Sequence, residues 1–459
     1  MIRPAPIATV VVVNYNGAHL LPDCLDALDA QRTGAPEFET VVVDNASTDD
    51  SLELLAAKYP WARVVASAAN LGFAGGNNLA LREVTTPFAV LLNNDATPES
   101  GWLANLLAPF AADRTEHLGM VTGKIVFMPR FIPVRFATPG FRPGVHDGRE
   151  LGMRVYAVTV RSADLSAEVS AKVLWESAAY GLERVGDQTY RWTRASGEVL
   201  VPVPLELTAA GTLREPIAVI LRVAAERDKE LTVGADRFRV GTQPSDIELR
   251  LPAGTPASDV INNAGGVVLR EGYGADRGFQ QIDRGQFDQP EEVFTACGNG
   301  LAIRTELGAT VGWFDDDFFM YYEDVDLSWR VRARGWSIRY QPDAVLRHIH
   351  AASSSEWSPR WVFHVDRNRL LVLTKNASFR LAVSAVLRYP LTTASMALRA
   401  GIEGVRVRQR PAMRPYLLRA TVLASYLRLL PRMLRRRRAI AHAASVSRAE
   451  LESWLVARP

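Results

Sequence analysis

Cysteine is scarce in this chain of 459 residues, which has only Cys24 and Cys297, far apart in the sequence. Two such residues exclude the disulfide framework of small secreted proteins and the paired-cysteine motifs of structural zinc sites. We therefore expect a protein suited to a reducing cytoplasm.

Long apolar runs and an excess of one charge are also missing. No stretch of about 18 apolar residues lacks a charged one, so we expect no membrane-spanning helix. The short apolar run near the N-terminus lacks a small-residue cleavage site and leads into a strand pattern, so we expect no signal peptide. The net charge of +3 does not by itself indicate a polyanionic partner. A length of 459 residues instead indicates one large domain with an insertion, or two to three domains.

Short apolar runs that alternate with helical patterns fill the first part of the chain. Continuous apolar strands in such an alternation predict a mainly parallel sheet covered by helices on both faces, an α/β fold. The predicted strands are 8–15, 38–45, 62–67 and 87–93, and the predicted helices are 18–31, 47–60 and 75–84.

Each of these four strands is followed by polar residues, at Asn14-Tyr15-Asn16, Asp44-Asn45, Asn70 and Asn93-Asn94-Asp95. Ligands of such sheets bind beyond the carboxyl ends of the strands, so we expect the four ends to form one crevice. Taken alone, the last segment fits a simple turn equally well, before a helix capped by Thr97 with Pro98 at its first position.

The pattern changes near residue 130. Short alternating segments separated by Gly, Pro, Asp and Ser predict an antiparallel β-sandwich, inserted into the α/β domain. Helix–strand alternation returns near residue 290, and the end of the chain is helical and rich in arginine. The predicted domains are a first α/β half over 1–130, the sandwich over 140–255, a second α/β half over 260–360 and a basic helical region over 361–459.

Five segments occur in an order that resembles one enzyme family: NYNGAHLLPDCLDAL, VVVDNASTDDS, NLGFAGGNN, LLNNDATPESGWL and GWFDDDFFMYYEDVDLSWRVRARGW. The chain resembles the inverting family-two glycosyltransferases of GT-A fold, particularly their rhamnosyltransferase-like and galactofuranosyltransferase-like branch. The resemblance covers about 1–128 and 262–375. It implies a metal-dependent transfer of a sugar from a nucleotide diphosphate.

The resemblance also implies roles for the strand ends. Asp95 stands at the metal-binding aspartate of the family motif, whose first carboxylate is Asn93 here. Asp44 matches the residue that accepts a hydrogen bond from a uracil or thymine base, although capping of the next helix is an alternative. The full set expected to bind the donor is Tyr15, Asn16, Asp44, Asn45, Asn70, Asn78, Asn94 and Asp95.

The second half supplies the expected catalytic and acceptor residues. By family match, Asp324 is the base that takes a proton from the acceptor hydroxyl, with Glu323 as runner-up. The alternative is that these acids only complement a helix dipole. His348 is expected to join Asp95 on Mn²⁺ or Mg²⁺. Residues expected near the acceptor are Gly298, Asn299, Trp313 and Asp316.

The insert and the tail extend this interpretation. In the sandwich, Trp175, Tyr180, Tyr190 and Trp192 are either platforms for sugars or core aromatics. Segment 414–438 has Leu418, Val422 and Tyr426 at helical spacing beside many arginines, which is typical either of a membrane-surface helix or of a packed helix with a solvated charge run.

The expected function is sugar transfer from dTDP-rhamnose, or from a UDP-sugar such as UDP-galactofuranose, to a cell-envelope polysaccharide or lipid-linked glycan. The expected location is cytoplasmic, with attachment to the inner face of the membrane through the basic helices. A homo-oligomer is compatible with the sequence. One rival is a non-catalytic glycan-binding or scaffold protein that keeps the fold, which would predict loss of the acids at 44, 95 and 324. The arginine run lacks the interleaved aromatics of a nucleic-acid-binding segment, so we expect no nucleic acid partner.

Overall fold

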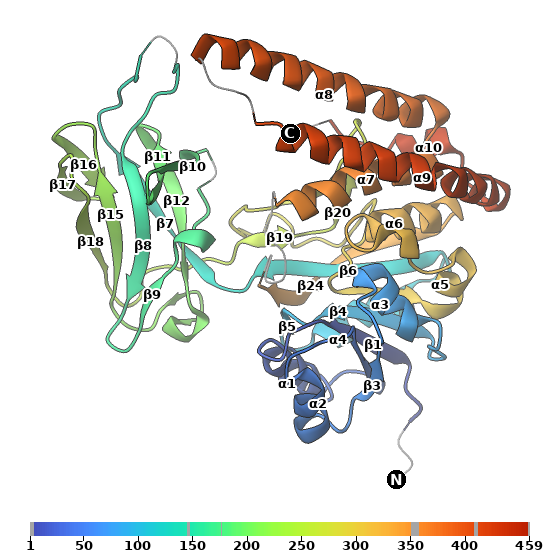
Figure 1. Cartoon of the computed structure of the whole chain (residues 1–459). Helices are drawn as coiled ribbons and strands as arrows, with labels where there is room; N and C mark the ends of the chain where they lie inside the picture. Colours follow the sequence, from blue (N-terminus) through green and yellow to red (C-terminus); the bar gives the residue numbers. More distant parts are fainter. Residues whose placement is uncertain (1–3, 145–146, 176, 350–357, 408–411, 458–459) are drawn as a thin grey trace. The chain divides into compact units, whose positions relative to one another are not determined.

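The computed structural model describes residues 4–144, 147–175, 177–349, 358–407 and 412–457 (Figure 1). They form two compact units. The α/β unit comprises the chain up to Val126, Asn262–Phe279 and the chain from Gly285 onward. The β unit comprises Phe127–Ile261 and Gln280–Arg284. The expected fold class, an α/β sheet domain with an inserted antiparallel sandwich and a C-terminal helical region, is confirmed.

The parallel half of the main sheet consists of β1 (Ala8–Asn14), β2 (Phe38–Asp44), β3 (Arg63–Ala66) and β4 (Phe88–Asn93). Strand β1 lies between β2 and β4, and β3 pairs with β2. Their register keeps the strand ends level, because Asn14 is opposite Asp44 and Val13 is opposite Asn93. The polar residues that follow these strands therefore begin at one edge of the sheet.

The other half of the sheet contains antiparallel strand pairs. Strand β23 lies between β4 and β6, antiparallel to both, and β24 follows β6 in the sheet. Strand β5 pairs with the end of β24, so Thr97 and Pro98 lie in a strand and not at the start of a helix, which the turn alternative required. The bounds are β5 (Ala96–Pro98), β6 (Leu118–Phe127), β19 (Ile261–Asn263), β22 (Glu291–Glu292), β23 (Leu301–Arg304) and β24 (Ser337–His348).

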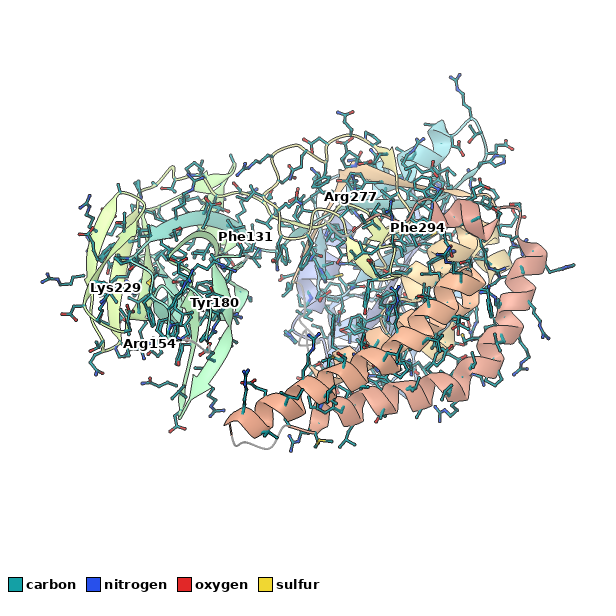
Figure 2. All side chains as sticks on the ribbon, turned by 90° about the horizontal axis from the view of Figure 1, so that it is seen from above. Phe131, Arg154, Tyr180, Lys229, Arg277 and Phe294 are labelled. Atoms are coloured by element: carbon teal, nitrogen blue, oxygen red, sulfur yellow. The ribbon has the colours of Figure 1, made fainter. Side chains whose placement is uncertain are left out.

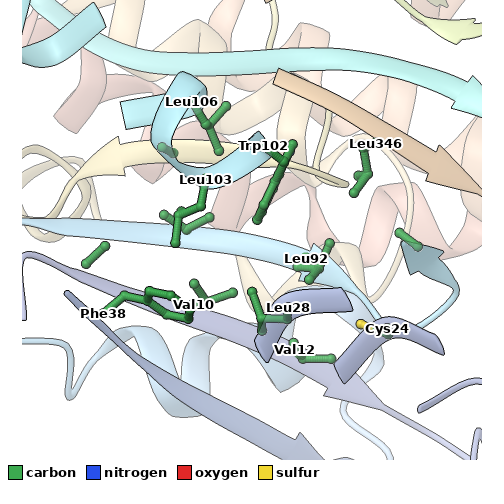
Figure 3. Packing of buried hydrophobic residues seen from close by; sticks show 14 of the residues in the cluster. Val10, Val12, Cys24, Leu28, Phe38, Leu92, Trp102, Leu103, Leu106 and Leu346 are labelled. Carbon is green, nitrogen blue, oxygen red and sulfur yellow. The ribbon is translucent and has the colours of Figure 1, made fainter. Parts of the chain in front are cut away.

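Helices cover this sheet: α1 (Leu21–Ala30), α2 (Ser51–Lys58), α3 (Gly72–Leu81), α4 (Trp102–Ala112), α5 (Thr305–Val311) and α6 (Glu323–Ala333). Figure 3 shows how Cys24 and Leu28 of α1 pack against Val10 and Val12 of β1. On the side of α4, Trp102 is fully buried in the same cluster. Helix α2 begins later than predicted, with Asp50 at its N-cap position, so Ser47 does not cap it.

The β unit is built from two antiparallel sheets, as the alternating segments predicted. One sheet contains β8 (Arg154–Arg161), β9 (Ser166–Glu168), β10 (Ala179–Val185), β11 (Gln188–Thr193), β15 (Ile217–Ala224) and β18 (Ser245–Leu251). The other contains β7 (Arg130–Ala137), β12 (Ser196–Val203), β16 (Lys229–Val233) and β17 (Asp236–Val240). Alternate residues such as Val158, Val160, Val201 and Val203 fill a core between them.

Arginines cover several aromatic rings of the β unit. The guanidinium of Arg154 lies 5.6–5.9 Å from the ring centres of Tyr156, Tyr190 and Trp192. That of Arg194 lies 5.0 Å from the ring centre of Tyr180. Figure 2 labels Arg154 and Tyr180 in the β unit. These contacts are cation–π interactions within the unit. They give Tyr180, Tyr190 and Trp192 partners in the protein itself, and their use as sugar platforms stays a prediction.

The C-terminal region is helical, with α7 (Pro359–Asn376), α8 (Phe379–Val407), α9 (Arg414–Ala443) and α10 (Arg448–Glu452). Helix α9 packs on α7 with the apolar residues that the sequence singled out, since Val422 and Tyr426 are buried and the Tyr426 hydroxyl bonds to Thr374 at 2.9 Å. That face of α9 is therefore part of the protein core and does not meet a membrane.

Helix α8 bears on the expectation that the chain has no membrane-spanning helix. Among the described residues, it is the one helix long and apolar enough to cross a membrane by length and composition. The prediction that no such helix exists rested on the absence of long runs without any charge, whereas α8 is apolar along its length although arginines interrupt it.

Candidate functional site

Asn14, at the end of β1, connects the ends of three strands. Its Nδ2 donates to Ser51 Oγ at 2.9 Å and lies 3.4 Å from Asp44 Oδ1. Its Oδ1 accepts from Asn94 Nδ2, beyond β4, at 2.8 Å. Asn14 is completely buried; it was expected at the crevice as one of the polar strand ends, but it was not in the set predicted to bind the donor. The signal for it was its place as the first polar residue after a β-branched strand.

Asp44 and Asn16 shape the turns beside Asn14. Asp44 is buried, and its Oδ2 accepts from the amide of Ser47 at 3.1 Å. This bond lies in the turn before α2 and does not cap that helix, which begins at Ser51 with Asp50 at its N-cap position. Asn16 has a positive φ of 50° and accepts from the amide of Thr48 at 2.7 Å. Tyr15 lies between these residues with 45% of its surface exposed, which leaves its ring available to a ligand.

Asn45 and Asn70 together build the turn that leads into α3. Asn45 donates to the carbonyl of Gly72 at 3.0 Å and accepts from the amide of Leu71 at 2.9 Å. Asn70 accepts from the amide of Gly72 at 2.8 Å. Gly72 has a φ of +70°, and a Cβ there would lie 2.3 Å from the carbonyl oxygen of Phe319. The turn thus requires glycine and brings α3 against the segment that precedes α6.

The two predicted metal ligands meet because β5 pairs with β24. His348 Nε2 lies 3.3 Å from Asp95 Oδ1, and His348 Nδ1 lies 3.0 Å from Asn262 Oδ1. The amide of Ile349 also donates to the carbonyl of Asp95 at 3.0 Å. A partner on Nδ1 fixes the orientation of the imidazole, so that Nε2 faces the carboxylate.

A divalent cation fits this pair. The described residues contain no cluster of three or more His, Cys, Asp or Glu side chains that could hold a metal ion without further ligands. One carboxylate and one imidazole leave most of the coordination sphere for phosphate oxygens and water, which Mg²⁺ and Mn²⁺ commonly take when a substrate phosphate is present. Asp95 and His348 would hold the ion.

Loop 297–300 links this pair to the predicted catalytic acids. The amide of Gly298 donates to Asp324 Oδ2 at 3.0 Å. The next residue, Asn299, accepts from the amide of Asn93 at 3.3 Å, two residues before Asp95. Gly298 also faces Phe73 of α3, since a Cβ there would lie 3.2 Å from that ring. Residues distant in the sequence therefore meet at one edge of the sheet.

The acids at the start of α6 differ in their surroundings. Burial raises the pKa of Asp324 to about 6, although the amides of Gly298 and Val325 act in the opposite direction. Burial, and then the charge of Asp324, raise the pKa of Glu323 well above its usual value. Glu323 Oε2 is buried without a hydrogen-bond partner. Glu323 is thus favoured in its protonated form, whereas Asp324 is ionised above about pH 6.

Asp326, the third acid of this run, is part of a buried ion network. It accepts from Lys375 Nζ at 2.8 Å, Arg330 Nε at 2.8 Å and Asn376 Nδ2 at 2.8 Å. Burial alone raises the pKa of Asp326, but the charges of Lys375 and Arg330 outweigh it and lower the pKa to about 2. Asp326 therefore anchors α6 to α7.

The segment before Glu323 has an unusual backbone. Phe319, Tyr321 and Tyr322 have φ angles of 66°, 67° and 69°, which cost energy for residues with a Cβ. Asn368 of α7 holds this segment, because its Nδ2 donates to the carbonyls of Phe318, Met320 and Tyr321 at 2.9, 2.8 and 2.7 Å.

Arg367, the neighbour of Asn368, strengthens this contact and donates to the carbonyls of Asp317 and Phe318 at 3.1 and 2.9 Å. The pair Arg367-Asn368 is hereafter called the α7 clamp. It fixes the strained segment from which Glu323 and Asp324 follow.

Three further predicted residues have structural partners. Trp313 is buried against Gly308. Asn78 donates to the carbonyl of Phe314 at 2.9 Å and to Asp316 Oδ1 at 2.5 Å, and Arg82 pairs with Asp316 at 2.8 Å. These contacts tie α3 to the segment after α5. The predicted roles of Asn78 with the donor and of Trp313 and Asp316 with the acceptor stay predictions.

A group of polar residues near the acids has no local signal in the sequence. Asn262, in β19, contacts His348, and the adjacent Asn263 donates to Asp276 Oδ1 at 2.5 Å. The charge of Asp276 raises the pKa of Asp324. These residues follow the sandwich directly in the sequence. Only the fold shows that the chain returns to the site there. His350, two residues after His348 in the sequence, lies outside the described residues.

Part of the chain matches one known protein family. Residues 9–155 match the model of the family described as glycosyl transferase family 2. An N-acetylglucosaminyl-diphospho-decaprenol L-rhamnosyltransferase of Mycobacterium tuberculosis is 42% identical over 62 residues, 14% of this chain and 20% of that protein. A teichoic acid poly(glycerol phosphate) polymerase of Staphylococcus epidermidis is 32% identical over 91 residues, 19% of this chain and 12% of that protein. The matches thus span a fifth or less of these relatives.

Among solved structures, GalNAc-T7 with UDP, GalNAc and Mn²⁺ aligns with a TM-score of 0.42 and 11% identity, over 81% of this chain and 48% of that one. A mannosyltransferase of Pyrobaculum calidifontis with GDP-mannose and Mn²⁺ aligns with a TM-score of 0.37 and 17% identity, over 98% of this chain and 79% of that one.

Proposed function

We propose that this chain, whose residues 9–155 match glycosyl transferase family 2, is an inverting glycosyltransferase that uses a nucleotide-diphosphate sugar. One observation carries the proposal. Loop 297–300 contacts Asp324 through Gly298 and the end of β4 through Asn299, which brings a candidate base and a candidate cation pair to the same edge of the sheet.

The acids at the start of α6 suit a division of roles. Inverting transfer requires a base that removes the proton of the acceptor hydroxyl while the oxygen attacks the sugar. Asp324 is ionised above about pH 6 and has one oxygen bonded to Gly298, so it is the better base. The buried Glu323 is favoured in its protonated form and lacks a partner on Oε2, so it is a candidate to donate to the acceptor.

The donor is held at the ends of the parallel strands. Tyr15, exposed between two asparagines, supplies a ring surface for the base, and Asp44 lies at the end of the neighbouring strand. Asp95 and His348 would hold a divalent cation, which when bound neutralises the departing diphosphate. For the donor we favour dTDP-rhamnose, and then a UDP-sugar such as UDP-galactofuranose.

The acceptor we propose is a cell-envelope polysaccharide or a lipid-linked glycan. The support comes from the relatives, one named as a transferase that acts on a diphospho-decaprenol and one as a teichoic acid polymerase. Such acceptors place the enzyme at the cytoplasmic face of the cell membrane.

A panel of nucleotide sugars tests this proposal. The purified full chain is incubated with dTDP-rhamnose, UDP-galactofuranose, UDP-glucose, UDP-N-acetylglucosamine and GDP-mannose, each with Mn²⁺, with Mg²⁺ or with EDTA. We expect cation-dependent release of the nucleoside diphosphate from one donor, and loss of this release in Asp324→Asn. Absence of turnover and of nucleotide binding with every donor would contradict the proposal.

A further inference from the structure

Within the described residues of the α/β unit, helix α8 leaves one face without a partner along most of its length. The apolar residues of this face recur at spacings of four and three, so they lie on one stripe of the helix. All are exposed: Leu387, Leu391, Ala394, Leu398, Ile402 and Val405. The stripe contains Val405 at 82% exposure and Leu391 at 68%. We call these six residues the α8 stripe.

The opposite face of α8 is already used inside the protein. Ala382, Ala385 and Tyr389 are buried, and the Tyr389 hydroxyl donates to Asp366 of α7 at 2.9 Å. Arg419 of α9 donates to Thr393 at 2.7 Å. Even so, only 17% of the most apolar window of α8 is buried. The stripe lies on the side of the helix opposite these packed residues. A helix with one face fixed to a protein is suited to lie on a membrane and not to cross it.

Basic residues flank the α8 stripe. Helix α8 carries four arginines and one glutamate, and α9 carries eight arginines and no acidic residue. At helical spacing, Arg388, Arg399 and Arg406 all lie on the same side of the stripe. The head groups of anionic lipids would meet these guanidinium groups while the leucines enter the boundary of the acyl chains.

Helix α9 repeats the arrangement. An exposed apolar stripe with spacings of three and four runs along it through Leu417, Ala420, Ala424, Leu427, Pro431 and Leu434. Arg428, Arg435 and Arg438 are also exposed on α9. Figure 1 shows α8 and α9 as the two long neighbouring helices of the C-terminal region. The two helices thus combine apolar and basic surface, the composition of an interfacial membrane anchor.

We propose that the α8 stripe, assisted by the exposed residues of α9, binds the interfacial region of a membrane that contains anionic lipids. This inference goes beyond the proposed sugar transfer and does not depend on it. It differs from the binding surface predicted from the sequence, because Val422 and Tyr426 of α9 are buried against α7. The protein would be held at the surface where lipid-linked molecules are found.

Vesicle flotation of the full chain tests the proposal. Vesicles of phosphatidylcholine alone are compared with vesicles that contain phosphatidylglycerol. The variant Leu391→Glu with Leu398→Glu places two charges in the α8 stripe. Its matched control is Leu182→Glu with Val185→Glu in β10, where the two residues are 63% and 64% exposed on the other unit. Circular dichroism and thermal melting establish that both variants fold.

We expect the wild-type chain and the control to float with anionic vesicles, and the stripe variant to bind about tenfold more weakly or worse. Equal binding of the stripe variant and the control would overturn the proposal, as would failure of the wild type to bind either vesicle. Extraction with alkaline carbonate should release the protein, and retention would indicate a spanning helix instead.

Analytical ultracentrifugation tests one more outcome. If the chain forms a dimer that the stripe variant breaks, and does not bind vesicles, the stripe is a contact with a second copy of this chain. Because binding is measured without any sugar donor, its failure leaves the proposed enzyme activity untouched.

Discussion

Asn368 Nδ2 donates to the carbonyl of Tyr321 at 2.7 Å, and through this bond α7 holds the backbone just before the two candidate catalytic acids. Tyr321 and Tyr322 both have positive φ angles, a conformation that non-glycine residues rarely keep without support. The geometry of Glu323 and Asp324 therefore depends on a side chain that lies far from them in the sequence.

The clamp predicts a specific effect of Asn368→Asp. The variant keeps the size of the side chain but replaces the donor with a carboxylate that faces three carbonyl oxygens. We expect the turnover number to fall by about tenfold or more, because small misplacements of reacting groups are costly. The KM for the donor should change little. The control is Asn105→Asp in α4, where Asn105 also donates to one carbonyl, that of Asp343, at 2.8 Å. An equal fall of turnover in both variants would contradict a positioning role.

The pH dependence of turnover should follow Asp324. Its pKa is raised to about 6, so the carboxylate is ionised above this pH and protonated below it. We expect kcat/KM to fall about tenfold for each pH unit below about 6. Measurement of initial rates from pH 4.5 to 8, with a check of folding at each pH, gives the profile. A profile without this acid limb would show that Asp324 is not the base.

The pairing of Asp95 with His348 predicts the affinity for a cation. In His348→Ala we expect Mn²⁺ to bind about 10–100-fold more weakly in the presence of a nucleoside diphosphate. Electron paramagnetic resonance of free Mn²⁺ measures this binding without any turnover. His117→Ala, on an exposed turn, is the control. Unchanged Mn²⁺ affinity in His348→Ala would remove this residue from the metal site.

The close contact at Gly72 predicts how alanine there changes the stability of the fold. Both Gly72 and Gly34 have positive φ angles, of +70° and +105°, so alanine is strained at either position. Only at Gly72 would the added Cβ meet a backbone atom, the carbonyl oxygen of Phe319 at 2.3 Å. We expect Gly72→Ala to lower the free energy of unfolding by about 2 kcal/mol or more, and Gly34→Ala by about 1 kcal/mol. Urea unfolding of both variants measures the difference, and equal losses would contradict the close packing of α3 against the segment before α6.

The parallel strands and their polar ends were predictable because local signals determine them. Continuous runs such as Val10–Val13 can hardly be anything but buried strands, and the residue that ends such a run lies at the edge of the sheet by necessity. Thr97 and Pro98 show the limit. Their local signal favours a helix start, but pairing with β24 places them in a strand.

The relationships that complete the site are not local. Strand β23 has four residues, too few to signal its place, yet it pairs with β4 next to the loop in which Gly298 contacts Asp324 and Asn299 contacts Asn93. Similarly, nothing in the segment around Asn368 shows which backbone it holds. The resemblance indicated which residues belong to the site, and only the fold shows how they support one another.

The most direct test of the account separates donor binding from transfer in three proteins: wild type, Asp324→Asn and Asp95→Ala. Binding of the nucleoside diphosphate with Mn²⁺ is measured by calorimetry, and donor turnover is measured on the same samples. We predict that Asp324→Asn binds the nucleotide like wild type without turning over the donor, and that Asp95→Ala loses both. Turnover by Asp324→Asn at the wild-type rate would contradict the claim that the residues joined by loop 297–300 form one catalytic site.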